Sequence, residues 1–229
     1  VPLHSWLPDA HAEGPTPVSA VLSGLLLNVA LYVLVRAKVL VDGTLHTHLA
    51  GNLMMGFGLL SVVVAAFMLS RQKDVKRMFA YSSIEHMGLI TFAFGMGGAV
   101  ATFAALLHMT MHALTKSAIF FAVGHATQKS GTQLMENIRG LIKTNPTIGW
   151  GLMIGTLAIL GMPPFGVFAS EFMIITTAMH DHPWSMPFLI ISLGVAFAAI
   201  FSRVQRMVFG ETSGERLPHP PALVPVFVH

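Results

Sequence analysis

Two histidines and a lysine stand inside an apolar stretch of membrane-spanning length, residues 104–121, with the sequence AALLHMTMHALTKSAIFF. His108, His112 and Lys116 follow one another at intervals of four residues. A helix with about 3.6 residues per turn therefore places all three on one stripe over about 12 Å of rise. Three proton-binding side chains on one face of an apolar helix indicate proton or ion chemistry inside a helix bundle.

Of the polar residues in this stretch, Lys116 is the one whose presence is hardest to explain by folding stability. A lysine in the middle of a transmembrane helix costs roughly 2.5 to 3.5 kcal/mol on insertion scales. We therefore expect its ammonium to face a bundle interior or water and to have a partner. An ionisable residue at such a position indicates a functional site by default.

Further polar residues fall within other apolar stretches: Glu85, His86, Glu171 and, as an amide, Asn28. Intramembrane residues of these types usually pair with one another and line ion or proton paths. A single histidine or Asn28 could instead only bond a neighbouring helix. A buried ion pair contributes little net stability, so folding alone does not explain why Lys116 and Glu171 are kept.

A metal site is the competing interpretation of the same residues. His108 and His112 have the i, i+4 spacing of helical zinc ligands, and Glu85 or His86 could complete the set. The sequence lacks the glutamate that follows the first histidine in HExxH motifs, and the Lys116 ammonium would repel a cation. We therefore predict no metal ligands and assign these residues to a proton path.

Composition indicates a polytopic membrane protein. Hydrophobic residues make up 54% of the 229 residues, charged residues only 10%, and the mean hydropathy is +0.69. The net charge of +3 does not indicate nucleic-acid binding, because the basic residues lie mostly in short loops between apolar runs. The chain has no cysteine, which excludes thiolate-bound iron–sulfur clusters on it. We expect no cofactor here and assign electron transfer to other chains.

The apolar pattern predicts an all-α, polytopic transmembrane helix bundle of about six spans within residues 16–209. Residues 1–15 are interrupted by prolines and are expected to form a loop or the end of a helix that begins upstream. Residues 210–229 are expected to be an extramembrane tail. The chain starts inside a motif, and we expect it to be a fragment of one longer transmembrane domain. The six predicted spans cover residues 16–36, 49–70, 78–98, 99–125, 146–179 and 186–208.

The fifth predicted span is long for one helix and contains Pro163, Pro164 and Gly166. We expect a discontinuous helix there, with two half-helices joined by unwound backbone at Pro163-Pro164. Broken helices are tolerated at membrane depth where they line a protein-enclosed or wet site. Glu171 follows Pro164 by seven residues and would lie on the second half-helix.

The basic residues predict an orientation in the membrane. Ten of the 13 lysines and arginines fall in the segments 71–77 and 126–145 and in the tail after 203. If the chain crosses the membrane six times, these three segments lie on the same side of it. The other side has Arg36 and Lys38. The excess of positive charge predicts that the first side is cytoplasmic.

Four motifs, in order, resemble the proton-pumping antiporter-like subunits of NADH:quinone oxidoreductase (respiratory complex I) and the Mrp-type cation/proton antiporters. They are HSWLPDAHAEGPTPVSAVLSGLLL, DVKRMFAYSSIEHMG, HALTKSAIFF and LAILGMPPFGVFASEF, and they extend over nearly the entire chain. The SSIEHMG and GMPPFGVFASEF versions resemble most closely the component F type of hydrogenase-4 membrane proteins, found in formate hydrogenlyase-like NiFe hydrogenase complexes.

The resemblance implies an inverted-repeat fold of about fourteen spans, of which this chain would be half, with Pro163-Pro164 in the second broken helix. It implies that Lys116 is the central lysine, His112 a conduction histidine and Glu171 the terminal acid. Where complex I relatives have a lysine in LLK, this sequence has LLLN with Asn28. A neutral amide cannot hold the charge, so the link there is made by another residue such as Glu85, or it is missing.

We therefore expect a proton-translocating, non-catalytic membrane subunit of a redox-driven respiratory or hydrogenase complex. Implied partners are other membrane-arm subunits, a peripheral redox arm, lipids, protons and, as an open alternative, sodium. The implied location is a bacterial or archaeal cell membrane. The alternatives are a structural or docking subunit that has lost conduction, which Asn28 would favour, and an independent cation/proton antiporter.

Overall fold

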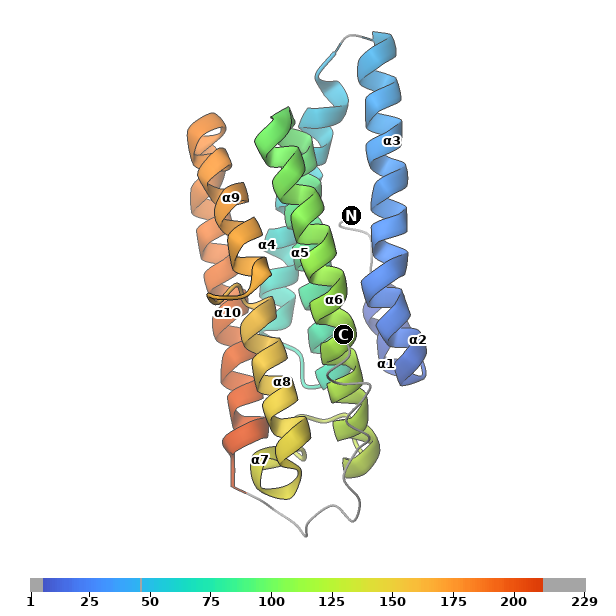
Figure 1. Cartoon of the computed structure of the whole chain (residues 1–229), viewed down its shortest axis with the longest axis vertical. Helices are drawn as coiled ribbons and strands as arrows, with labels where there is room; N and C mark the ends of the chain where they lie inside the picture. Colours follow the sequence, from blue (N-terminus) through green and yellow to red (C-terminus); the bar gives the residue numbers. More distant parts are fainter. Residues whose placement is uncertain (1–5, 46, 212–229) are drawn as a thin grey trace.

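The computed structural model describes residues 6–45 and 47–211, and within them 85% helix and no strand confirm the all-α prediction. The long helices run roughly side by side along one axis (Figure 1). In chain order the elements are α1 (Trp6–Glu13), α2 (Thr16–Val21), the π-helix η1 (Leu22–Leu26), α3 (Leu27–Leu45), α4 (Leu49–Leu69), α5 (Val75–Met96), α6 (Gly98–Ser130), α7 (Leu141–Thr144), α8 (Pro146–Ile159), α9 (Gly166–Asp181), the 3-10 helix η2 (Pro183–Ser185) and α10 (Met186–Phe209).

Four stretches of helix in the described part are long and apolar enough to cross a membrane: Thr16–Thr44, Leu49–Leu69, Gly98–Ser130 and Pro183–Phe209. Helix α8 is apolar but shorter. Helix α5 has 22 residues, but its charged and polar side chains lower its hydropathy. It is nevertheless the most enclosed helix, because it packs against α1, α3, α4, α6 and α9.

Helices α4 and α5 approach each other closely through glycines. A Cβ atom on Gly58 would lie 2.7 Å from the main-chain oxygen of Gly88, and one on Gly88 would lie 2.9 Å from that of Gly58. Small residues at such a contact let helix backbones pack tightly in membranes. This packing orients α5 so that its face with Glu85 and His86 points toward α6 and α9.

Two predicted boundaries were wrong. The first span was expected to end at Arg36, with Asp42 and Gly43 in a loop, but the helix continues to Leu45. An i, i+4 ion pair with a 2.8 Å separation between Lys38 and Asp42 accommodates both charges within the helix. The polar loop expected at 126–145 is also partly helical, because α6 extends to Ser130 and α7 lies within it.

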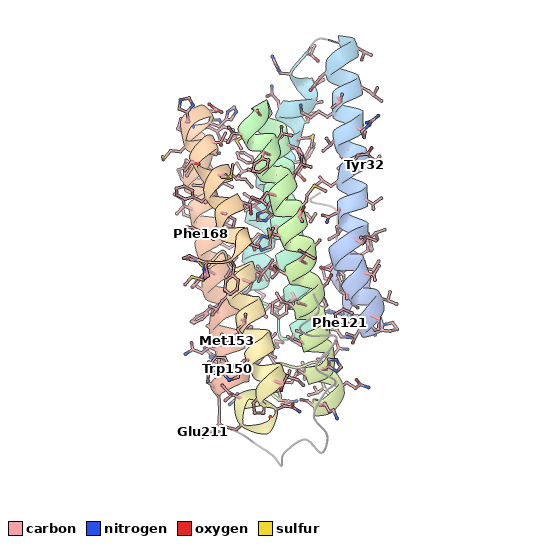
Figure 2. All side chains as sticks on the ribbon, viewed as in Figure 1. Tyr32, Phe121, Trp150, Met153, Phe168 and Glu211 are labelled. Atoms are coloured by element: carbon pink, nitrogen blue, oxygen red, sulfur yellow. The ribbon has the colours of Figure 1, made fainter. Side chains whose placement is uncertain are left out.

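The segment before the first span, expected to be a loop or helix end, forms the short helix α1. Residues 1–5 and 212–229, and with them most of the predicted extramembrane tail, lie outside the described residues. Aromatic side chains such as Tyr32, Trp150 and Phe168 are exposed on outer faces of the bundle (Figure 2). Such surfaces suit contact with lipid or with neighbouring membrane helices.

The basic segments gather at one end of the bundle. The turn after α4 pairs with the loop after α6, where the amide of Val75 donates to Gln133 and that of Met135 donates to Lys73, both at 3.0 Å. The end of α10 reaches the same region, because a Cβ on Gly210 would lie 3.6 Å from Cβ of Arg139. The three segments therefore lie together, as the charge pattern predicted.

Candidate functional site

Three helices bring the predicted polar residues together in the interior. Helix α5 supplies Glu85 and His86, α6 supplies the stripe of His108, His112 and Lys116, and α9 supplies Glu171. All except Glu171 are fully or almost fully buried, and Glu171 is only slightly exposed. The i, i+4 stripe of α6 therefore faces the bundle interior, as the sequence predicted.

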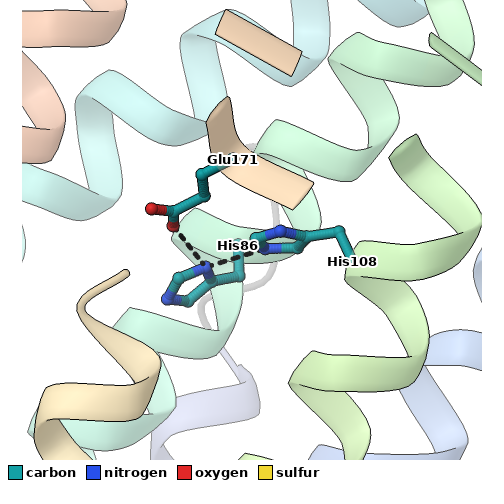
Figure 3. Close-up of side chains that lie close together, drawn as sticks. All are labelled: His86, His108 and Glu171. Carbon is teal, nitrogen blue, oxygen red and sulfur yellow. Dashed lines mark hydrogen bonds and ion pairs between the residues drawn. The ribbon is translucent and has the colours of Figure 1, made fainter. Parts of the chain in front are cut away.

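A chain of close contacts runs from Glu171 to His108 through His86 (Figure 3). Nδ1 of His86 lies 3.7 Å from Oε1 of Glu171 and 3.0 Å from Nε2 of His108. The same nitrogen thus faces both an acid and a second imidazole. A proton on His86 could move toward either neighbour with a small change of ring position.

Ser170 extends this chain and orients His108. Its hydroxyl lies 2.9 Å from Nδ1 of His108 and donates to the main-chain oxygen of Val167 at 2.9 Å. When the hydroxyl proton points to Val167, the serine oxygen accepts from Nδ1–H of His108, and Nε2 of His108 is left to accept from His86. The direction in which the Ser170 hydroxyl points therefore decides which of the two histidines donates the hydrogen bond between them.

His112 lies next to this chain without joining it by a direct hydrogen bond. Its ring centroid is 5.4 Å from that of His86. Both ring nitrogens are buried and have no hydrogen-bond partner in the part of the chain that the structure describes. Buried polar atoms that lack a protein partner usually bond to water. His112 is thus placed to connect His86 to Lys116 one turn away.

Lys116 has no exposed surface. Its Nζ donates to the main-chain oxygen of Phe79 on α5 at 2.8 Å and lies 5.5 Å from the centroid of the Phe79 ring. Glu85 and His112 are close enough to the ammonium for electrostatic interaction. The expectation that Lys116 faces the interior with partners nearby is therefore met.

The predicted helix break is present between α8 and α9 and shapes the surroundings of Glu171. Helix α8 ends at Ile159, α9 begins at Gly166, and the Pro163-Pro164 peptide bond is cis. Gly161 has a φ of 65°, a left-handed conformation that favours glycine. The carboxylate of Glu171 packs directly onto it, so that a Cβ at this position would overlap Oε2.

A cleft of about 250 Å³ opens between the helix break and α10. Its polar lining consists of Glu85, His86 and Glu171, and the remainder is apolar. This volume is large enough for several water molecules, each of which occupies about 30 Å³ in the liquid. The two acids and His86 thus share a space through which the site can reach the outer face of the bundle.

Asn28 differs from the other predicted residues, because it binds the main chain. Its amide nitrogen donates to Gly24 at 3.0 Å and to Met109 on α6 at 3.3 Å, which joins two helices. Its Oδ1 atom is buried and accepts no hydrogen bond from any described residue. The sequence left open whether Asn28 only bonds a neighbouring helix, and these hydrogen bonds agree with that interpretation.

Two connections to Lys116 were not predicted. The carbonyl that binds Lys116, that of Phe79, also accepts a hydrogen bond from Ser83 Oγ at 3.2 Å. Ser83 is in turn 2.8 Å from the hydroxyl of Ser23 in the π-helix η1. Single-turn π-helices are frequent at functional sites. A series of hydrogen bonds therefore leads from Lys116 to η1 through hydroxyl side chains, which are ordinary in apolar helices.

The second unpredicted connection is His11 on α1. Its ring is fully buried, stacks on Phe120 at 4.9 Å between centroids, and interacts electrostatically with Lys116 and Lys76. Its two nitrogens have no hydrogen-bond partner within residues 6–45 and 47–211. The motif HSWLPDAH contains this histidine, but the prolines around it predicted only a loop or a helix end.

A metal ion would meet a different set of residues from the one considered in the sequence. Ligand atoms of His86, His108 and Glu171 lie within 4.8 Å of one another, whereas His112 is not among them. Two histidines and a carboxylate are a set that transition metals bind. Here, both nitrogens of His108 already face hydrogen-bond partners, namely His86 and Ser170.

The sequence profile described as NADH:quinone oxidoreductase/Mrp antiporter, TM, matches residues 1–198. The chain belongs to this family. Among curated relatives, the hydrogenase-4 component F homolog of Methylacidiphilum infernorum is 53% identical over 228 residues, which are 100% of this chain and 48% of that protein. The NAD(P)H-quinone oxidoreductase chain 4 of Parasynechococcus marenigrum is 31% identical, over 96% of this chain and 41% of its own length.

Chains in three solved membrane complexes have the same fold. A chain of the archaeal membrane-bound sulfane sulfur reductase superposes with a TM-score of 0.89 and 34% identity over 95% of this chain and 45% of its own. A chain of respiratory complex I from Thermus thermophilus gives 0.84 with 24% identity, over 93% and 46%. A chain of the Mrp complex from Dietzia gives 0.85 with 20% identity, over 97% and 42%. The chain thus spans less than half the length of these relatives, and it is an antiporter-like membrane subunit.

Proposed function

We propose that this chain carries protons within a membrane-arm subunit of a redox-driven complex. The observation that carries the proposal is the buried series Glu171, His86 and His108, followed by His112 and Lys116 one and two turns further along α6. Proton-binding groups are expensive inside an apolar bundle, and a continuous series of them is the usual construction of proton paths. Family membership adds support, because relatives belong to hydrogenase and quinone-reductase systems.

Within this proposal, Glu171 exchanges protons with the cleft beside α10, and the histidines pass them along α6 to Lys116. From Lys116, the Phe79 carbonyl and the two serines lead toward η1, and His11 leads toward Lys76 at the basic end. The partners in this proposal are other membrane-arm subunits and a peripheral redox arm, and the redox cofactors belong to those partners. The basic end is assigned to the cytoplasmic side of a bacterial or archaeal cell membrane.

The test is the number of protons translocated per electron pair by the full complex in sealed vesicles. Glu171→Gln keeps the shape of the side chain but removes its titration, and we expect proton translocation to fall while electron transfer with an uncoupler persists. Glu211→Gln, at an exposed position, is the matched control and should behave as the wild type. An unchanged proton ratio in Glu171→Gln would contradict the proposal.

The docking alternative draws on one observation, the use of Asn28 as a helix–helix contact. It makes the opposite prediction in the same vesicles, because Glu171→Gln would then leave the proton ratio unaltered and alter only assembly. An independent antiporter would transport protons in vesicles that hold the subunit alone under an imposed pH gradient. The two measurements separate the three functions.

A further inference from the structure

A second cleft, of about 290 Å³, opens at the basic end of the bundle. It lies between the end of α4, the loop after α6 and the last turns of α10. One carboxylate, Glu136, lines it, and the other charged residues of its wall are cationic: Arg71, Lys73, Arg139, Arg203 and Arg206. We propose that this cleft binds the phosphodiester headgroup of an anionic phospholipid.

Two of the arginines are held in place by main-chain oxygens. Arg203 donates to Ala199 at 2.9 Å and also to Ser70, which ties α10 to the end of α4. Arg139 donates from Nε to the carbonyl of Glu136 at 2.9 Å, and no hydrogen bond from its terminal nitrogens to a described residue competes with a ligand. Guanidinium groups fixed in this way bind phosphate oxygens with little loss of side-chain freedom.

The cationic side chains in the cleft wall outnumber its one carboxylate, Glu136, by five to one. No salt bridge among the described residues involves any of the five cationic side chains. Arg203 and Arg206 are close enough to repel each other electrostatically. A bound anion relieves this repulsion, and the single Glu136 carboxylate cannot balance five positive charges.

The position of the cleft favours a lipid over a free phosphate ion. Helices α4 and α10 are both long and apolar enough to span a membrane, so their ends lie at the headgroup layer. Basic pockets between transmembrane helices at such a level suit anionic headgroups. The cleft therefore lies where phospholipid headgroups are concentrated.

An exposed apolar stripe on α4 leads to the cleft and provides a surface for acyl chains. Its members recur at intervals of four and three residues, share one helix face and are all exposed: Leu53, Phe57, Leu60, Val64 and Phe67. Ser70 and Arg71, in the turn that follows the end of α4, line the cleft. A cationic site at the end of an apolar stripe matches the two parts of a phospholipid.

The experiment measures lipid binding to the purified complex that contains the full-length subunit, by native mass spectrometry. The probes are dioleoyl phosphatidylglycerol, dioleoyl phosphatidylcholine and inorganic phosphate. The variant Arg139→Gln/Arg206→Gln removes two exposed charges of the cleft. The control Lys129→Gln/Lys143→Gln removes the same charge at the same end of the bundle, at positions outside the cleft.

We expect phosphatidylglycerol binding to weaken roughly tenfold or more in the arginine variant, since each cation near the surface contributes to anionic lipid binding. Phosphatidylcholine binding should not change, and the lysine control should resemble the wild type. Equal phosphatidylglycerol binding in the arginine variant and the control would overturn the proposal. Inorganic phosphate that displaced the lipid completely would also overturn it, because the acyl stripe would then contribute nothing.

A second measurement distinguishes a lipid from a protein partner on the same face. A photo-crosslinking residue at Phe67, on the stripe next to the cleft, should capture phospholipid in the intact complex. Capture of another subunit at this position would show a protein interface and would overturn the proposal. Neither measurement depends on proton conduction, so the proposal stands or fails separately from the proposed function.

Discussion

Ser170 and His108 hold each other across the interface of α6 and α9, with 2.9 Å between the serine hydroxyl and Nδ1 of the imidazole. Ser170 precedes Glu171 and lies in the half-helix that begins after the break. The geometry of the break thus determines not only where the acid lies but also which histidine nitrogen faces His86. In the proposed proton path, Ser170 is therefore a positioning residue.

Ser170→Ala is expected to lower proton translocation by the complex while its assembly stays normal. Without the hydroxyl, Nδ1 of His108 loses its partner, and neither orientation of the His86–His108 pair is selected any longer. The loss should be several-fold, smaller than that caused by removing a titrating group, because general acid–base groups in enzymes contribute roughly a hundredfold or more. The measurement is the proton ratio in vesicles as a function of pH.

Two variants serve as controls for this prediction. Ser170→Thr keeps the hydroxyl and should restore both the ratio and its pH profile. Ser61→Ala removes an equally buried hydroxyl on α4 that has no hydrogen-bond partner among the described residues, and it should have no effect. A loss in Ser61→Ala equal to that in Ser170→Ala would show that packing, and not orientation, is responsible.

Lys116→Met is expected to separate conduction from stability. Methionine keeps much of the length of the side chain and removes the buried ammonium. Replacement of a buried charge by an apolar residue of similar volume is often neutral or stabilising. We therefore expect an unchanged or higher Tm together with at least a roughly tenfold loss of proton translocation.

The measurement pairs thermal unfolding of the purified complex with the vesicle assay. Lys143→Met, at an exposed position on α7, is the matched control. A large fall in Tm with intact translocation would mean that the bond from Lys116 to the Phe79 carbonyl serves folding. In that case, Lys116 would not belong to the proton path.

The main features of the site could be predicted because they depend on local sequence. The spacing of His108, His112 and Lys116 fixes their common helix face, and Pro163-Pro164 fixes the break that precedes Glu171. Both are properties of a single segment. Their roles in proton transfer remain predictions.

The pairing between helices could not be predicted, because it depends on how α5 is rotated against α6 and α9. Nothing in the sequence states that His86 meets His108 at 3.0 Å while Glu85 faces the cleft. Ser83 and Ser23 gave no signal, since hydroxyl residues are common in apolar helices. His11 could have been noticed as a second histidine of its motif, but its burial depends on the tertiary packing of α1.

His11 is expected to make stability depend on pH. Burial first, and then the charges of Lys116 and Lys76, lower the pKa of His11 from its usual value to about 4. In the unfolded chain, a histidine titrates near 6.5, so between these values the unfolded state binds more protons than the folded state. The contribution of His11 to stability is therefore complete above about pH 6.5 and is lost as the pH falls toward 4.

His11→Gln removes this titration and should flatten the decrease of Tm between pH 7 and pH 5. The measurement is thermal unfolding of the purified full-length protein across this range. His48→Gln, at an exposed position, should keep the wild-type slope. An unchanged slope in His11→Gln would show that this ring is not held neutral in the folded protein.

Gly161→Ala tests whether the unwound backbone positions Glu171. The new Cβ would overlap the carboxylate, so the acid must leave its present position beside His86 and the cleft. The positive φ adds a backbone cost of about 1 kcal/mol, which by itself lowers only stability.

Gly131→Ala is the matched control, because Gly131 has the same φ of 65° and nothing lies within 4 Å of a Cβ there. Both variants should lower Tm by a similar amount. Only Gly161→Ala should lower proton translocation, because only there is the carboxylate displaced. Equal translocation in the two variants would show that the path does not require the contact between Glu171 and the helix break.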